Sequence, residues 1–207
     1  NLWMSVLNEL RNDPKRQQEI KNCAIQCQKN QSLRYYEKIY GQPNSYEGYA
    51  LFICLHGGGQ GKAEMNDSQW KDIIPFLNSG FQNGTIAVAP RGITNTWNLH
   101  FVDETFPAMV RLIENFIIFK NVDPNRVYLI GFSAGGDGTY SLSERIPFML
   151  AASSPQGGHP NGISTLNLSN LPIYLAVGEK DSAYKRNTVA VEYYNQIIKQ
   201  NGKYCGN

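Results

Sequence analysis

The feature that most restricts the fold of this 207-residue chain is a repeated order of apolar run, turn and helical pattern. A continuous apolar run indicates a strand that is buried on both faces, since neither face of such a strand meets water. Strands are predicted at residues 49–55, 85–89, 126–130, 149–153 and 173–177, and helices at 67–77, 104–120, 137–145 and 187–200. Strands that alternate with helices predict an α/β fold, a doubly wound and mostly parallel sheet whose ligands collect at the carboxyl ends of its strands.

The first 32 residues are polar with spaced apolar positions, and they predict a helical extension ahead of this pattern. Asp13 before Pro14 predicts the N-cap and first turn of a second helix. Cys23 and Cys27 are expected on a helix, with a spacing that suits neither a zinc site nor a disulfide. A strand is expected next, at residues 33–40.

No repeat or linker interrupts the sequence, so residues 1–207 are interpreted as a single domain. The amphipathic extension allows an alternative role, in which it joins copies of the chain into a homo-oligomer. The four cysteines form no disulfide framework, which favours a reducing cytoplasm and leaves secretion open.

Composition excludes several classes of partner and names none. Lys and Arg number 19 against 17 Asp and Glu, and a net charge of +2 is too mild for binding nucleic acid. No apolar run is long enough to span a membrane. No metal and no organic cofactor are expected, because no His, Cys or Asp cluster has ligand spacing and no glycine-rich run follows a nucleotide-binding pattern.

The strongest chemical signal is Gly131-Phe132-Ser133-Ala134-Gly135-Gly136, which lies directly between a predicted strand and a predicted helix. In this context G-x-S-x-G is typical of a nucleophile elbow, in which the serine stands on a tight and strained turn. Glycines are needed two residues before and two residues after the serine, because side chains there would collide with neighbouring backbone. Ser133 is therefore the predicted nucleophile, and the alternative is a glycine-rich turn with an incidental serine.

A second glycine loop, His56-Gly57-Gly58-Gly59, follows the strand at 49–55. Its backbone N–H groups, together with that of Ala134, predict an oxyanion hole that binds a carbonyl oxygen as it becomes negative. His56 itself is interpreted as a structural residue, which fixes the loop through a ring hydrogen bond and does not carry protons.

Asp181, in the polar segment after the last predicted strand, is the candidate triad acid. Serine, then acid, then histidine is the chain order of triads built on such an elbow, and the acid orients the imidazole. Glu179 is the competing residue, disfavoured because it lies less far past the strand end. Asp103, Glu104 and Asp137 are interpreted as carboxylates that favour helix starts.

Together these segments resemble the α/β-hydrolase superfamily and, within it, the esterase and dienelactone-hydrolase-like branch. The resemblance covers about residues 33–202 and includes Asn66-Asp67-Ser68-Gln69-Trp70, Ala89-Pro90-Arg91, Thr96-Trp97-Asn98, Asp123-Pro124-Asn125-Arg126-Val127-Tyr128, Gly158-His159-Pro160-Asn161 and Asp181-Ser182-Ala183-Tyr184. It implies a serine hydrolase that needs no cofactor and acts on a small-molecule ester.

The resemblance also implies a triad histidine on a loop after one further strand, which residues 1–207 do not contain. We expect the gene to continue beyond Asn207 with that strand, the histidine and a closing helix. Asn201-Gly202 is expected to cap the helix at 187–200 and to lead into the strand.

Four further residues are expected near the carboxyl edge of the sheet. His100 could line the pocket. His159 is interpreted as a substrate contact or a loop residue, since it precedes the acid in the chain and so has the wrong order for the base. Trp97 and Tyr184 are each either a wall of the pocket or a residue that closes the end of the core.

The preferred function is that of a carboxylesterase that acts on small or medium esters through an acyl-enzyme on Ser133. A peptidase or a lactone hydrolase could use the same residues, since a fold does not fix the substrate. An alternative of another class is an inactive binding or scaffold protein, which the absent histidine favours.

Overall fold

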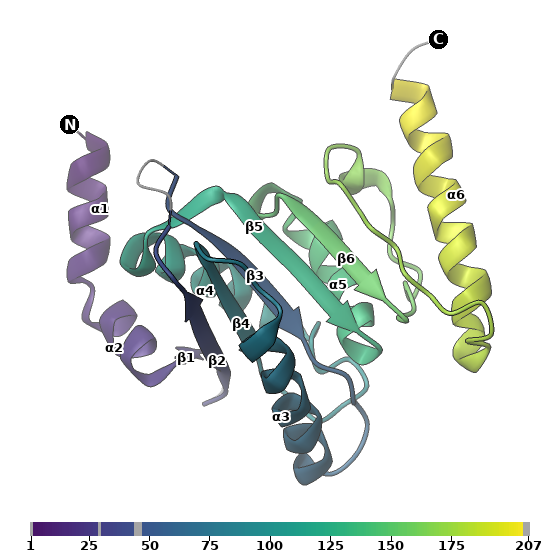
Figure 1. Cartoon of the computed structure of the whole chain (residues 1–207), viewed down its shortest axis with the longest axis horizontal. Coiled ribbons are helices and arrows are strands. Elements are labelled where there is room, and N and C mark those ends of the chain that lie inside the picture. The colour runs from purple at the N-terminus through teal and green to yellow at the C-terminus, as the bar shows by residue number, and fades with distance from the viewer. Residues whose placement is uncertain (1, 29, 44–46, 205–207) are drawn as a thin grey trace.

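A computed structural model describes residues 2–28, 30–43 and 47–204. Its centre is a six-stranded sheet in the order β1-β2-β4-β3-β5-β6 (Figure 1). The strands are β1 (Ala24–Gln26), β2 (Ser32–Tyr40), β3 (Tyr49–Leu55), β4 (Thr85–Pro90), β5 (Val122–Phe132) and β6 (Ala152–Gln156). The last four run parallel, whereas β1 and β2 add antiparallel pairs at one edge. The expected mostly parallel sheet is confirmed.

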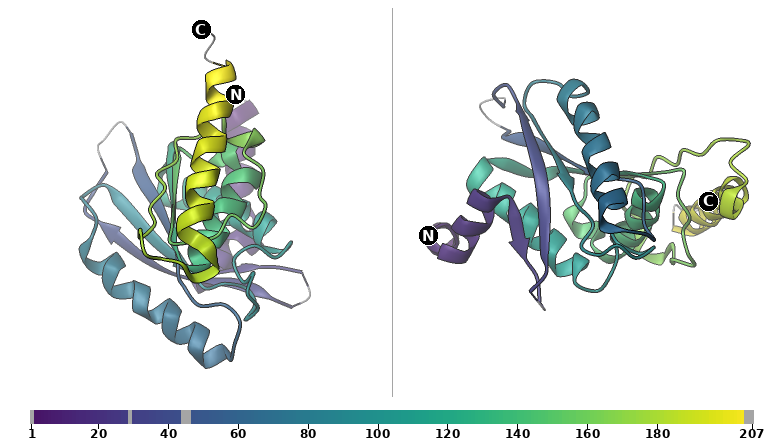
Figure 2. Two further views of the ribbon diagram at one scale, coloured as in Figure 1. Left: turned by 90° about the vertical axis from the view of Figure 1, so that its right-hand side faces the viewer. Right: turned by 90° about the horizontal axis from the view of Figure 1, so that it is seen from below.

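Helices cover both faces of this sheet. α3 (Ala63–Ser79) lies on one face, and α4 (Thr105–Lys120) and α5 (Ala134–Arg145) lie on the other (Figure 2). The core is divided in the same way, because alternate residues of a strand point to opposite faces. Ile53 belongs to the cluster that contains Phe116 of α4, and its neighbour Cys54 to the cluster that contains Leu77 of α3. The doubly wound arrangement is therefore confirmed.

The N-terminal extension forms α1 (Leu2–Asn12) and α2 (Pro14–Asn22) before β1. Asp13 caps α2 as predicted, and its Oδ1 accepts hydrogen bonds from the amides of Lys15 at 2.8 Å and Arg16 at 3.4 Å. The helical position expected for the two cysteines is wrong. Cys23 ends α2 in a left-handed conformation, and its amide donates a hydrogen bond to the last turn of that helix. Cys27 follows β1.

Buried polar contacts hold α2 on α4. Arg16 is 7% exposed and donates hydrogen bonds to Asn115 Oδ1 and Glu114 Oε2, both at 2.8 Å. Glu19 Oε2 accepts from Arg111 Nε at 2.9 Å and from Asn115 Nδ2 at 2.8 Å. These bonds hold the inner face of α2 against α4 of the same chain.

Two of the predicted strands differ in the structure. The strand expected at 149–153 is β6, which starts later because Pro147–Met149 form a 3-10 turn after α5. The segment at 173–177 runs beside β6 but forms only isolated bridges, Ser153 with Ile173 and Gln156 with Ala176. Pro155 lies between these bridges and has no N–H group to donate, so the ladder is interrupted.

The last helix, α6 (Arg186–Tyr204), packs against α5 beyond β6, where the rings of Tyr140 and Tyr193 lie 4.9 Å apart. The cap expected at Asn201-Gly202 is wrong, because both residues lie inside α6. A glycine inside a helix costs only about 1 kcal/mol relative to alanine, so the helix continues through it. None of the described helices combines the length and the apolar character that crossing a membrane requires.

Candidate active site

Ser133 lies between the last residue of β5 and the first residue of α5, as predicted. Its backbone has φ 56° and ψ −121°, outside the regions that strands and right-handed helices occupy. Its amide donates to Gln156 O at 3.0 Å, and its carbonyl accepts from Asp137 N at 3.0 Å. These bonds to β6 and to α5 hold the serine in its strained turn, which is the local geometry of a nucleophile elbow.

Two glycines make this turn possible through close approach of backbone. A Cβ on Gly131 would lie 2.1 Å from Gly135 O, and a Cβ on Gly135 would lie 2.3 Å from Leu55 O. Both distances are too short for any side chain, and the atoms in the way belong to backbone that cannot rotate aside. The glycine spacing of the motif therefore follows from the contact of β5, α5 and β3.

The His56–Gly59 loop passes beside the serine. A Cβ on Gly57 would lie 3.6 Å from Ser133 Cβ, so the two backbones are neighbours. The amide of Gly59 is already used, because it donates to Asn66 Oδ1 at 2.8 Å. The amides of Gly57 and Gly58 are then the loop's remaining candidates for binding a substrate oxygen. The N–H of Ala134, in the first turn of α5, has no acceptor within its own helix.

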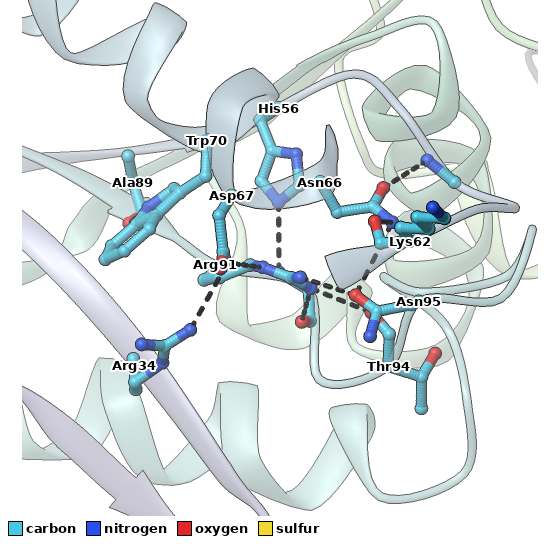
Figure 3. Close-up of polar contacts among 12 residues, drawn as sticks. Arg34, His56, Lys62, Asn66, Asp67, Trp70, Ala89, Arg91, Thr94 and Asn95 are labelled. Atoms are coloured by element: carbon cyan, nitrogen blue, oxygen red, sulfur yellow. Dashed lines mark hydrogen bonds and ion pairs between the residues drawn. The ribbon is translucent and has the colours of Figure 1, made fainter. Parts of the chain in front are cut away.

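Figure 3 shows the polar network that supports this loop. Asn66 is fully buried, and its Nδ2 donates to Lys62 O at 3.3 Å and to Asn95 Oδ1 at 3.4 Å. Arg91 also donates to Asn95 Oδ1, and its Nε donates to Asp67 Oδ1 at 2.9 Å. Asn66 and Asn95 thus connect the glycine loop to the 91–97 loop, a connection that the sequence motifs did not predict.

His56 is 1% exposed and has both ring nitrogens engaged. Nε2 accepts from Gly92 N at 3.1 Å, so Nδ1 carries the proton and donates to Gly57 O at 2.6 Å. Burial lowers the pKa of His56 to about 4. These contacts agree with a structural role in the loop and leave no ring nitrogen free for a substrate.

His100 is also 1% exposed, and its Nε2 lies 2.8 Å from His56 O. Burial lowers its pKa well below the ordinary value. The expectation that His100 could line the pocket is wrong, because its ring packs against that of His56 at 4.5 Å beneath the loop.

A cavity of about 530 Å³ opens beside the elbow. Five of the predicted site residues line it: Gly58, Gly59, Trp97, Ala134 and His159. Trp97 is 50% exposed, so it is a wall of the cavity and does not close the core. Tyr184 lines the cavity too, so it is a wall of the cavity like Trp97. The sequence did not single out five other lining residues for this role: Gln60, Asp137, Asn161, Lys185 and Arg186.

Asp137 lies in the first turn of α5, as expected, and it also has a role that the sequence did not predict. Its Oδ1 accepts from His159 N at 2.7 Å and its Oδ2 from Asn161 Nδ2 at 3.2 Å, so it holds the loop after β6 against α5. Burial raises its pKa, while these hydrogen bonds oppose the shift. His159 is fixed in addition by Asn161 N, which donates to its Nδ1 at 2.8 Å.

Asp181 lies past the 173–177 segment, near the end of β6. A Cβ on Gly157 would lie 3.8 Å from Asp181 Oδ2, and Asp181 Oδ1 is 3.9 Å from a guanidinium nitrogen of Arg186. Glu179 is exposed and does not line the cavity. No hydrogen bond within the described residues joins a histidine to Ser133 or to Asp181.

The strand order, the elbow after β5 and the glycine loop after β3 define the α/β-hydrolase fold, and solved structures agree. A thermostable esterase matches with a TM-score of 0.58 and 23% identity, over 84% of this chain and 48% of that one. The acylaminoacyl peptidase of Pyrococcus horikoshii matches with a TM-score of 0.59 and 15% identity, over 85% and 34%. The chain has the α/β-hydrolase fold.

Two curated proteins are similar in sequence. A bifunctional acetylxylan esterase/xylanase of Neocallimastix patriciarum is 29% identical over 147 residues, 69% of this chain and 21% of that protein. A poly(3-hydroxybutyrate) depolymerase of Ralstonia pickettii is 26% identical over 151 residues, 63% of this chain and 30% of that protein. The chain therefore spans less than a third of either relative. No protein-family model matches the sequence.

Proposed function

We propose that this chain is an esterase domain of the serine hydrolase type, with Ser133 as its nucleophile. The observation that carries the proposal is the strained backbone of Ser133. Ser133 lies between β5 and α5, and its neighbour Ala134 lines the cavity. Such strain costs about 1–3 kcal/mol and persists where the surrounding structure imposes it, often at active sites. Similarity to an acetylxylan esterase and to a depolymerase of a polyester supports an ester as the substrate.

In the proposed reaction Ser133 Oγ attacks the ester carbonyl and forms a tetrahedral intermediate. The N–H of Ala134 and an amide of Gly57 or Gly58 bind the oxyanion, and one such donor is worth about 3–4 kcal/mol of transition-state stabilisation. The alcohol then leaves with a proton. Water attacks the acyl-enzyme, releases the acid and restores the serine hydroxyl.

None of the described histidines is placed to accept the proton of the Ser133 hydroxyl. His56 and His100 are buried with lowered pKa values, and Nδ1 of His159 is occupied by Asn161. Asp181 is proposed as the acid that orients the histidine, and the histidine expected beyond Asn207 stays a prediction. The engaged histidines are also the observation that favours the second candidate function, an inactive binding or scaffold domain.

Covalent labelling separates the two functions, because a fluorophosphonate reacts quickly only with an activated serine. We expect a protein that carries the triad histidine to be labelled at Ser133, and Ser133→Ala to abolish this labelling without lowering the melting temperature. Ser182→Ala, an exposed serine next to Asp181, is the matched control and should be labelled like the wild type. A Ser133→Ala protein that is still labelled would reject the assignment. A wild-type protein that reacts no faster than free serine would favour the binding domain.

The proposed substrates are esters of small or medium acids. The lining of the cavity of about 530 Å³ includes the polar side chains of Gln60, Asp137, Asn161 and Lys185, and burying a long alkyl chain against them would remove their hydration. The names of both relatives also contain short acyl units, acetyl and 3-hydroxybutyrate. A higher kcat/KM for p-nitrophenyl decanoate than for p-nitrophenyl acetate would contradict this, and faster cleavage of the matching anilide would favour a peptidase.

A further inference from the structure

The cavity beside Ser133 has a positively charged end. Lys185 and Arg186 line it where the loop before α6 meets that helix, near the carboxyl ends of β5 and β6 (Figure 1). Tyr184 and Lys185 have φ values of 53° and 58°, a region that residues other than glycine seldom occupy. The chain thus holds two consecutive residues in strained conformations at the point where the two cations reach the cavity.

Arg186 has hydrogen-bond donors without acceptors. Its Nε is buried and has no partner. Its guanidinium lies 3.9 Å from Asp181 Oδ1, too far for a hydrogen bond, and 5.2 Å from the centre of the Tyr184 ring. The ring lies against one face of the guanidinium and therefore accepts none of the N–H groups in its plane. A planar fork of donors is the geometry that binds a carboxylate through two parallel hydrogen bonds.

Both carboxylates near the cavity act on Arg186. Asp181 Oδ1 lies 3.9 Å from its guanidinium, and the charge of Arg186 opposes the rise that burial causes in the pKa of Asp137. Asp137 lines the cavity, and both of its carboxylate oxygens already accept hydrogen bonds from the loop after β6. Lys185 has no ion pair within the described residues, so its charge is left for a ligand.

We infer that Lys185 and Arg186 bind a free carboxylate on the substrate, so that the domain prefers esters bearing an acid group over neutral esters of the same length. Arg186 acts as the planar fork and Lys185 as a point charge. This inference rests on the proposed function, because the same cavity would hold the ester beside Ala134.

Binding to the Ser133→Ala protein tests the inference without chemistry, since this variant keeps the cavity and cannot form an acyl-enzyme. NMR titration gives the Kd of monomethyl succinate against methyl butanoate, and of monomethyl adipate against methyl hexanoate. We expect the acid of at least one pair to bind about tenfold more tightly than its neutral partner. The difference should shrink with added salt, which screens the ion pair.

Lys185→Met and Arg186→Gln, made in the Ser133→Ala background, should each bring the ratio of the two Kd values close to one. Lys180→Met is the matched control, because Lys180 is exposed on the same loop and does not line the cavity, and it should keep the original ratio. Equal Kd values within both pairs, or a preference that survives both substitutions, would overturn the inference.

The test is independent of turnover, so its failure is distinct from a failure of the proposed function. If Ser133 is labelled but the carboxylates bind no better than the neutral esters, the proposed hydrolase function stands and the inference of a carboxylate ligand is overturned. A carboxylate preference without labelling would support the ligand and assign it to a binding domain.

Discussion

At the scale of single residues, the shape of the glycine loop depends on one buried amide side chain. Asn66 Oδ1 accepts the Gly59 N–H, and a Cβ on Gly58 would lie 2.7 Å from the same oxygen. Asn66 therefore fixes the direction of the peptide groups that precede Gly59. It touches no substrate atom in the proposed reaction and acts as a positioning residue for the oxyanion amides.

Asn66→Ala should slow the labelling of Ser133 by about 10–100-fold at saturating probe, because the loop amides lose their fixed direction. Apparent probe affinity should change little, since the cavity walls remain. Asn66→Asp keeps an acceptor for Gly59 N–H and should recover part of the rate. Asn78→Ala, near the other end of α3, is the control, because its exposed side chain bonds only Tyr36. An equal rate loss in the alanine and aspartate variants would contradict the positioning role.

The pKa of His56 makes the stability of the fold depend on pH. The folded value of about 4 is below the unfolded value near 6.5, so the unfolded chain binds the proton first as pH falls. The stability that a neutral His56 allows is complete above about pH 6.5 and is lost as pH falls toward 4, by roughly 3 kcal/mol in all. Urea unfolding at pH 7 and pH 4.5 measures this loss.

His56→Gln should show a smaller loss of unfolding free energy over that pH range than the wild type, although it is less stable at pH 7. His159→Gln, in which the ring removed has no hydrogen bond to the glycine loop, should keep the wild-type pH dependence. A His56→Gln protein with an unchanged pH dependence would show that other groups, such as the buried His100 or the carboxylates, cause the acid sensitivity.

At the scale of elements, the parts that could be predicted from sequence depend on local geometry. The elbow was recognisable because Gly131 and Gly135 are required by contacts that recur wherever a strand turns into a helix over a serine. The interruption of the segment at 173–177 was not recognisable from the sequence, because the N–H group that is missing from the ladder is that of Pro155, on a different strand. The same holds for the site: Asn66 and Arg186 act through partners that no spacing in the sequence connects.

The docking of α2 on α4 gives a prediction at this scale. Arg16→Ala should lower the free energy of unfolding by about 2–4 kcal/mol, because Asn115 and Glu114 lose a buried charged partner. Lys15→Ala, at an exposed position of the same helix, should change it by about 0.5 kcal/mol or less. Chemical denaturation of both variants measures the difference. A neutral Arg16→Ala would mean that the contacts of Arg16 with α4 contribute nothing to the domain's stability.

At the scale of the whole molecule, one apolar cluster connects the extension to the elements that carry the candidate site. Ile25 of β1 and Leu33 of β2 belong to the same cluster as Leu142 of α5, the helix that follows the proposed nucleophile. The sheet therefore offers no boundary at which the described chain could divide into separate units. α6 is attached differently, through the smaller cluster around Tyr140 and Tyr193.

We therefore expect the chain to unfold in one cooperative transition, in agreement with the single domain predicted from the sequence. Far-UV circular dichroism reports all the helices, and the fluorescence of a Trp3→Phe protein, which lacks the tryptophan of α1, reports Trp70 on α3 and Trp97 at the cavity. The two midpoints in urea should coincide, and Arg16→Ala should move both by the same amount, because the shared core transmits the loss at α2 to the whole sheet. A circular-dichroism midpoint below the fluorescence midpoint would contradict this and would show that α1 and α2, or α6, unfold before the sheet.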